Sequence, residues 1–264
     1  MFRFWVGVPS AACLLMVAGA CSRVVPEAET RVHAATAPAT RDPGVAVVEL
    51  FTSEGCSSCP PADRVLAQLA ERAKSSAMPI YALSFHVDYW NYLGWRDHFS
   101  SADYSERQRG YASIAPNGGI YTPQAVINGE AECVGSDSAQ IDAQISAALK
   151  RASRTRIELS ARRANSSIEV SYSATGDTRG RVLNLALVEP HAESAVQSGE
   201  NAGERLSHVN VVRAFVTRSL ASNTAGTWSS VPSADFGAGR VGVVAYAEDD
   251  SQRDISGASA LELE

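Results

Sequence analysis

VAVVELFTSEGCSSCPPAD, residues 45–63, is the stretch of sequence that decides the fold. Its first part, Val45 to Phe51, is short, apolar and rich in β-branched residues, which is typical of a strand covered on both faces. Pro60 and Pro61 suit the first turn of a helix, where the missing N–H costs nothing. Apolar residues then recur at helical spacing through Ala73. The sequence therefore predicts a strand, a tight exposed turn that carries a Cys-x-x-Cys pair, and a helix.

The Cys-x-x-Cys pair at the start of a helix indicates redox chemistry. Unpaired backbone N–H groups and the helix dipole favour a thiolate, so Cys56 is the candidate nucleophile. Two intervening residues bring Cys59 within bonding reach, which makes it the candidate resolving thiol. The alternatives are a static structural disulfide or part of a zinc site. Zinc prefers about four ligands, and the sequence has no second Cys-x-x-Cys and no His-x-His cluster, so no metal site and no cofactor are assigned.

The N-terminus is typical of a targeting segment. Residues 1–21 form a short, mostly apolar segment that ends in small residues, as a secretory signal peptide does. Ala18-Gly19-Ala20 suits ordinary cleavage, but small residues directly before Cys21 also resemble a bacterial lipobox, in which Cys21 becomes a lipid anchor. We favour the lipoprotein, located in the periplasm or cell envelope. Residues 22–44, rich in Ala, Pro and Thr, are expected to be a disordered linker.

Composition narrows the class of partner. The chain of 264 residues has a net charge of −6 and is 45% hydrophobic, enough for one or two packed domains. No basic block with interleaved aromatic residues is present, so nucleic acid is not expected as a partner. Outside the cytoplasm disulfides persist. Cys56 and Cys59 can then pair with each other, which leaves Cys133 in the folded part of the chain without a partner cysteine. It is interpreted as a small buried apolar residue, with an auxiliary redox or metal role as the alternative.

The remainder of residues 45–152 alternates strand and helix patterns. A second buried strand at 79–87 is followed by an aromatic loop and a helix at 101–114. Thr122-Pro123 then leads into a third strand, and Asn128-Gly129 is a strong hairpin signal. A fourth strand at 130–134 and a helix at 136–149 complete the predicted elements.

Read together, these elements resemble the minimal thioredoxin fold. The resemblance depends on Cys56-Ser57-Ser58-Cys59 at the start of the first helix and on Thr122-Pro123 before the third strand. It implies that Pro123 is cis and lies against the cysteine pair, and that Thr122 offers backbone groups to an extended substrate. The alternative is an ordinary trans proline at a strand start.

Longer motifs resemble a family of secreted bacterial proteins known as a domain of unknown function with a thioredoxin-like fold. The matching stretches are VVELFTSEGCSSCPPAD (47–63), HVDYWNYLGW (86–95), YTPQAVING (121–129) and GENAGERLSHVNVVR (199–213). The Ser-Ser pair between the cysteines departs from the Gly-Pro of thioredoxin. A redox potential or a partner therefore does not carry over from thioredoxin.

The aromatic loop at 86–97 supplies accessory candidates, because α/β sites lie at the carboxyl ends of strands. His86 is a candidate proton shuttle or copper ligand, and Asp88 a candidate proton acceptor from Cys59. Trp90 is a candidate wall for a peptide substrate. The alternative is that these side chains only satisfy buried groups and fill the core. Glu54 is expected to be a solvated loop charge.

Residues 153–264 change to short alternating runs separated by turn residues, which predicts an all-β, sandwich-like domain. His208, Asn210 and Arg213 are candidates for a cleft against the first domain, with an ordinary hairpin as the alternative. The expected runs are Thr155–Ala161, Ser167–Ser173, Val182–Glu189, Val209–Thr217 and Arg240–Glu248.

The sequence therefore predicts a thioredoxin-like α/β domain followed by an all-β domain. The expected function is an extracytoplasmic thiol–disulfide oxidoreductase whose partners are the thiols or disulfides of envelope proteins, with a membrane anchor through Cys21. The alternative is a non-enzymatic module of the cell envelope that binds copper or a partner protein. In the third interpretation, an interaction protein, the cysteine pair is only structural.

Overall fold

The computed structural model describes residues 1, 32–33, 43–113, 118–231, 236, 239–249 and 253–264. Its helices are α1 (Pro60–Ser75), the 3-10 helix η1 (Asn91–Leu93), α2 (Ala102–Ala112) and α3 (Ser138–Leu149). Its strands are β1 (Val32–His33), β2 (Ala46–Thr52), β3 (Ile80–His86), β4 (Gln124–Ile127), β5 (Ala131–Val134), β6 (Thr155–Ala164), β7 (Ser167–Gly176), β8 (Arg181–Ala195), β9 (Arg205–Ser219), β10 (Ala225–Ser230), β11 (Val241–Asp249) and β12 (Ile255–Leu263).

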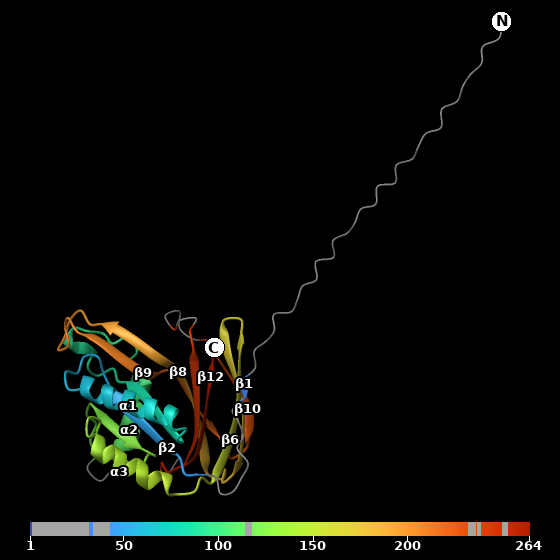
Figure 1. Cartoon of the computed structure of the whole chain (residues 1–264), viewed down its shortest axis with the longest axis horizontal. Coiled ribbons are helices and arrows are strands. Elements are labelled where there is room, and N and C mark those ends of the chain that lie inside the picture. The colour runs from blue at the N-terminus through green and yellow to red at the C-terminus, as the bar shows by residue number, and fades with distance from the viewer. Residues whose placement is uncertain (2–31, 34–42, 114–117, 232–235, 237–238, 250–252) are drawn as a thin grey trace.

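Most of these strands belong to one mixed sheet of eight, in the order β12-β11-β8-β9-β3-β2-β4-β5 (Figure 1). Strand β3 pairs in parallel with β2 and with β9, and the other neighbours are antiparallel. A second, antiparallel sheet has the order β1-β6-β7-β10. The described part of the chain therefore combines the strands of both halves of the sequence in a single large sheet.

Three apolar layers pack against the large sheet. Helices α1 and α3 cover one face of β2, β3 and β4, with Leu66 and Ile141 among the buried side chains. Helix α2 covers the opposite face through Tyr104 and Tyr111. The four-stranded sheet packs on β8, β11 and β12, where Leu185 is fully buried. In Figure 1 the helices lie at the β2 side of the molecule and the four-stranded sheet at the other.

The two halves of the chain meet where β3 lies beside β9. The register there contains one pair, Ser84 with Val211. Asn210 adds a hydrogen bond from Nδ2 to the Ala82 carbonyl at 3.0 Å. The hydroxyl of Tyr104 in α2 donates to the Val212 carbonyl, also at 3.0 Å. A short backbone junction and side-chain bonds therefore join the two halves.

The expected fold class, a thioredoxin-like α/β domain followed by an all-β sandwich, is wrong. The local elements between residues 45 and 149 occur in the expected order. However, β8, β9, β11 and β12 do not form a separate sandwich, because they continue the sheet that contains β2 and β3. Strands β10 and β12 were not expected at all. Strand pairing over long sequence distances, which local patterns do not encode, causes the difference.

The predicted signal peptide (1–21), including Cys21, lies outside the described residues apart from residue 1. So does most of the predicted linker. Within that linker, Val32 and His33 form β1 and pair with Ala161 and Ser160 of β6.

A buried ion-pair cluster connects α2 to the sheet. Arg107 donates to both oxygens of Glu49 in β2, each at 2.7 Å, and lies 3.4 Å from Glu248 in β11. The hydroxyls of Tyr111 and Tyr246 donate to Glu49 at 3.1 and 2.6 Å. Both glutamates are at most 2% exposed and the Arg107 side chain is 7% exposed. One guanidinium thus contacts carboxylates from both halves of the chain.

We expect Arg107→Met to lower the free energy of unfolding by about 3–5 kcal/mol, because it leaves two buried carboxylates without their cation. Urea unfolding followed by circular dichroism measures the change. The control is Arg109→Met, which removes an exposed pair with Glu106 on the same helix and should change stability by less than about 0.5 kcal/mol. Equal losses in the two variants would contradict the role given to the cluster.

Candidate functional site

The cysteine pair lies where strand β2 passes into helix α1, as the sequence predicts. Cys56 and Cys59 form a disulfide with 5.4 Å between their Cα atoms. Cys59 is the N-cap residue of α1 and Pro60 begins the helix. The carbonyl of Cys59 accepts from the backbone N–H groups of Ala62 and Asp63. The pair therefore lies at the positive end of the α1 dipole.

Both cysteines are fully buried, with exposed fractions of 0%. The expected exposed position of the sulfurs is therefore wrong for this state of the protein. Ser57 and Ser58 between them are exposed, so only the apex of the turn reaches the surface. Sγ of Cys56 lies 3.3 Å from Oγ of Ser58. Access to the disulfide requires the surrounding chain to move.

The Thr122-Pro123 peptide bond is cis, as the resemblance to thioredoxin implies. Pro123 is buried. A Cβ atom added to Gly135 would lie 3.2 Å from the Cβ of Pro123 and 3.1 Å from the Cβ of Ala62 in α1. The start of β4 is therefore next to the first turn of α1, which Cys59 caps.

Trp90 connects this proline to the cysteine turn. Its indole Nε1 donates to Oγ1 of Thr122 at 2.7 Å. Its Cβ lies 3.2 Å from where a Cβ on Gly55 would be, and Gly55 directly precedes Cys56. The structure therefore places the candidates Trp90, Thr122 and Pro123 around one turn.

Asp88 has a different neighbour. Its carboxylate Oδ1 accepts from the hydroxyl of Ser105 at 2.6 Å, and its backbone N–H donates to the same hydroxyl at 3.2 Å. Ser105 lies in the first turn of α2. The contacts that the structure gives Asp88 therefore fix the start of α2 and do not join it to the cysteine pair.

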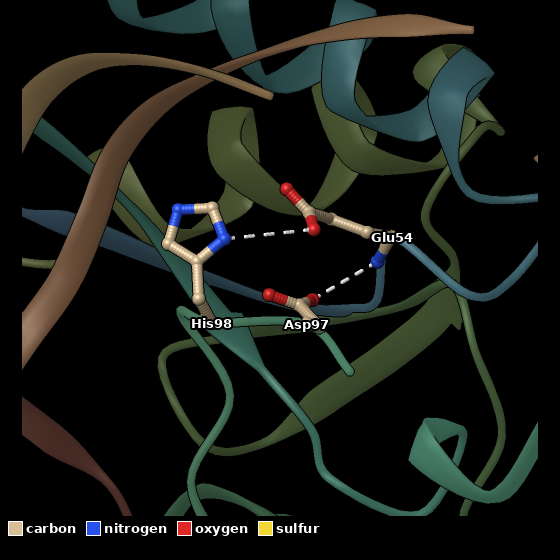
Figure 2. Close-up of side chains that lie close together, drawn as sticks. All are labelled: Glu54, Asp97 and His98. Atoms are coloured by element: carbon tan, nitrogen blue, oxygen red, sulfur yellow. Dashed lines mark hydrogen bonds and ion pairs between the residues drawn. The ribbon is translucent and has the colours of Figure 1, made fainter. Parts of the chain in front are cut away.

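His86 belongs to a buried charged cluster next to the cysteine turn. Its Nδ1 lies 2.7 Å from Oδ2 of Asp97, and both side chains are fully buried. The same Asp97 oxygen accepts from the backbone N–H of Glu54 at 3.0 Å. Figure 2 shows Asp97 beneath Glu54, with His98 beside it. His86 is thus linked to the cysteine turn through Asp97.

Glu54 is fully buried, so the expectation of a solvated loop charge is wrong. Its Oε2 accepts from the indole of Trp95 at 2.7 Å. On its other side lies His208 of β9, with Nε2 3.6 Å from Oε1 of Glu54 and Nδ1 3.6 Å from Oδ2 of Asp63. The rings of His86 and His208 meet edge to face, with centroids 4.7 Å apart. His208, a candidate for a cleft, is therefore packed inside the cluster.

The charge states of His86 and Asp97 support each other. Burial by itself lowers the pKa of His86, but the carboxylates of Asp97, Asp63 and Glu54 together outweigh burial, and the pKa is raised. Burial likewise raises the pKa of Asp97, but His86 and the backbone N–H groups of Glu54 and Phe99 outweigh burial, and that pKa is lowered. The geometry therefore favours a charged pair.

The pKa values of the two remaining carboxyls shift in opposite directions. Burial raises the pKa of Glu54, but contacts with His208, Ser194 and Trp95 outweigh it, and the pKa is lowered. Burial raises the pKa of Asp63 above its ordinary value, and attraction to His208 offsets only part of that increase. Asp63 lies one helical turn after Cys59, so the cluster holds a carboxyl with a raised pKa in the first turn of α1.

Glu54, Asp97 and His98 have potential ligand atoms within 4.8 Å of one another. Three of the four carboxylate oxygens already accept hydrogen bonds. Both oxygens of Asp97 accept hydrogen bonds, from Glu54 N and His86 on one side and from Phe99 N on the other. This grouping, the one found among the described residues, includes neither cysteine nor His86, so it does not match the copper site considered from sequence.

Cys133 is a free, buried thiol, as expected. Burial, with smaller contributions from Asp137 and Glu132, raises the pKa of the Cys133 thiol to about 11. A thiol that stays protonated at neutral pH is a poor nucleophile.

Sequence reasoning did not find Asp63, Asp97, Glu200 or Asn201 as neighbours of the cysteine turn. Asn201 Nδ2 donates to the carbonyls of Glu54 and Cys56 at 2.8 and 3.0 Å. Within its segment, 199–213, the sequence indicated His208, Asn210 and Arg213 as candidates for a cleft, but not Asn201. Because Asn201 lies 145 residues from Cys56, no local pattern reveals the contact.

The fold and the site together define a mostly β protein with a buried Cys-x-x-Cys disulfide at the start of a helix. Residues 47–248 match the model of a protein family described as "Protein of unknown function (DUF1223)", and the chain belongs to this family. No curated protein matches the sequence. No described helix is long and apolar enough to cross a membrane.

Two solved structures are similar. A crystal structure of a protein from Agrobacterium tumefaciens is 28% identical, covers 85% of this chain and 96% of that chain, and has a TM-score of 0.59. HBP35 of Porphyromonas gingivalis is 13% identical, covers 84% of this chain and 76% of that chain, and has a TM-score of 0.58. At that identity the second likeness concerns the fold alone.

We expect the stability difference between the wild type and His86→Gln to shrink as pH rises. The raised pKa of His86 means that its stabilisation is complete below about pH 6.5, the ordinary value, and is lost as pH rises through the folded pKa. The slope reaches at most ~1.4 kcal/mol per pH unit for one group. Urea unfolding between pH 6 and 9.5 measures it.

The control for this series is His191→Gln, whose side chain is 60% exposed and which should follow the wild-type curve. A pH-independent difference between wild type and His86→Gln would show that His86 is uncharged in the folded protein.

Proposed function

We propose that the protein is an extracytoplasmic thiol–disulfide oxidoreductase that acts on thiols or disulfides of envelope proteins. One observation carries the proposal: a Cys56–Cys59 disulfide caps helix α1, and the cis Thr122-Pro123 bond lies against the first turn of the same helix. The helix N-terminus stabilises a thiolate on the nucleophilic cysteine.

The exchange proceeds in two steps. A substrate thiolate attacks Sγ of Cys56, the Cys56–Cys59 bond breaks, and Cys59 leaves with the electron pair and takes up a proton. A second substrate thiolate then attacks the substrate sulfur of the mixed disulfide, which releases Cys56 and leaves the substrate oxidised. In the reverse direction Cys56 attacks a substrate disulfide and Cys59 resolves the intermediate.

Neighbouring side chains have supporting roles in this proposal. The hydrogen bond from Trp90 to Oγ1 of Thr122 fixes the residue that precedes the cis proline, so its backbone can align an extended substrate segment. Asp63, with its raised pKa, lies one turn after Cys59 and can exchange a proton with the leaving thiolate.

We expect Cys56→Ser to abolish exchange, Cys59→Ser to accumulate a mixed disulfide with the substrate, and Cys133→Ser to remain active, because only the first two act in the reaction. The assay is the oxidation of a reduced, unfolded ribonuclease, or the reduction of insulin in the opposite direction. Undiminished exchange by Cys56→Ser would overturn the role of Cys56.

A second candidate is a non-enzymatic envelope module that binds a partner protein and uses the disulfide to brace its fold. The complete burial of both sulfurs favours it. The copper form of this candidate needs thiolates and so concerns the reduced protein. A wild-type protein without exchange activity would favour the structural role, and stoichiometric binding of Cu(I) by the reduced protein would favour the copper form.

We propose that Cys21 is lipidated and holds the protein at a membrane, which fits envelope substrates. Cys21→Ala should move the protein from the membrane fraction to the soluble periplasmic fraction, because the attachment site for the lipid is lost. Fractionation of cells followed by immunoblotting measures the change. Cys133→Ser is the matched control, and a soluble wild type would show that the signal is simply cleaved.

A further inference from the structure

The turn between β8 and β9 lies against the cysteine turn. Asn201 in this turn is 6% exposed and donates from Nδ2 to the carbonyls of Glu54 and Cys56. Next to it, Oε2 of Glu200 accepts from the backbone N–H of Ser57 at 3.0 Å. The carbonyl of Cys56 and the N–H of Ser57, which belong to the same peptide bond, are therefore both bonded to residues from the second half of the chain.

The same turn also contacts the aromatic loop. Oγ of Ser198 donates to the carbonyl of Gly94 at 2.5 Å. Gly199 has a positive φ of 80°, and a Cβ there would lie 3.3 Å from the Cβ of Trp95. We call residues 198–203 the cover segment, because they lie over the turn that holds the buried disulfide.

The cover segment is at the end of a two-stranded arm. Strand β11 pairs with β8 only as far as Val188, and β3 pairs with β9 only at Val211. Between these points the two strands of the arm, Glu189–Ala195 and Arg205–Asn210, pair with each other and with no other described strand. A two-stranded ribbon has little stability of its own, so the arm depends on its contacts with the body of the protein.

Irregular backbone marks the base of the arm. The pairing of β8 with β9 shifts register between Leu187 and Val188. Further along β9, two residues before Val212, which is the partner of Val188, Asn210 has a φ of 48°, an unusual value for a residue other than glycine. The arm therefore leaves the sheet at a local break in regular pairing, where a bend changes few hydrogen bonds.

The closed position contains buried polar atoms with no hydrogen-bond partner. They are Nδ1 and Nε2 of His208, Oγ of Ser194 and Oε1 of Glu54. His208 and Ser194 belong to the arm and Glu54 to the cysteine turn. The two His208 nitrogens face Glu54 and Asp63 at 3.6 Å, which is longer than a hydrogen bond. Water would give these atoms hydrogen bonds of normal length, so part of the cost of separating the arm from the turn is offset.

We propose that the arm is a movable cover, and that residues 198–203 must leave the cysteine turn before the Cys56–Cys59 disulfide can react. This inference rests on the proposed function for its purpose, since a redox site must admit its partner. The structure shows the closed, latent form, in which bonds from Asn201 and Glu200 hold the cover over a disulfide that is 0% exposed.

The test is the rate at which dithiothreitol reduces the Cys56–Cys59 disulfide in the full-length protein, followed by alkylation and mass spectrometry. Asn201→Asp keeps the size of the side chain but removes both donated hydrogen bonds, and Asn201→Ala removes them without adding charge. We expect both variants to be reduced about tenfold faster than the wild type. Glu200→Ala should have a smaller effect in the same direction, because that residue is exposed.

Two controls separate opening of the arm from other causes. Arg205→Ala alters the exposed surface of the arm, where Arg205 pairs with Glu193, and should be reduced at the wild-type rate. Leu159→Ala weakens the core beneath the four-stranded sheet, away from the arm, and should accelerate reduction less than the Asn201 variants do. The proposal is overturned if both Asn201 variants react at the wild-type rate, or if Leu159→Ala accelerates reduction as much as they do.

Reduction by dithiothreitol does not depend on catalysis. A protein that shows the accelerated rates but exchanges no disulfide with protein substrates would keep the cover and lose the proposed function. Active exchange with unaltered rates in the Asn201 variants would keep the function and lose the cover.

Discussion

The ion pair between Arg107 and Glu49 is the interaction on which the rest of the structure depends. Glu49 lies in the middle of β2, the strand that leads directly into the cysteine turn. The same guanidinium reaches Glu248 of β11, and the carboxylate of Glu248 accepts from Asn184 of β8 at 2.7 Å. One cation therefore fixes β2 relative to strands of the second half, including β8, which carries the arm. Since two carboxylates share this one guanidinium, removal of Arg107 leaves both of them buried without a cation.

The local features of the fold follow from the sequence because they depend on neighbouring residues. Pro60 favours the start of a helix because the proline ring fixes φ at a value that suits the first turn. Asn128-Gly129 adopts the positive φ values of a tight turn, 50° and 73°. The cis bond at Pro123 came from resemblance, since no local property of Thr122-Pro123 requires it. The combination of these features placed the cysteine pair at the correct junction of strand and helix.

The failures come from contacts between distant parts of the chain. The sequence of β11, VGVVAYAED, is apolar at most positions, which is a signal for a strand covered on both faces. The strand is indeed buried at all but its last position, whereas a sandwich strand alternates between core and solvent. Such a strand must have both faces covered and neighbours on both edges. Glu54 was misjudged for the same reason. A carboxylate in a loop is normally solvated, but Trp95 and His208, brought by distant segments, contact the carboxylate of Glu54 in the folded protein.

The burial of the disulfide and the burial of charge have one structural origin. His208 lies on the arm and Glu54 lies on the cysteine turn, so the closed arm both covers the sulfurs and holds an imidazole between two carboxyls. Displacement of the arm would separate His208 from Glu54 and admit water to that carboxylate, where charges interact less strongly than in a protein interior. Access to the sulfurs and the electrostatics of the buried cluster thus depend on the same contact and would change together.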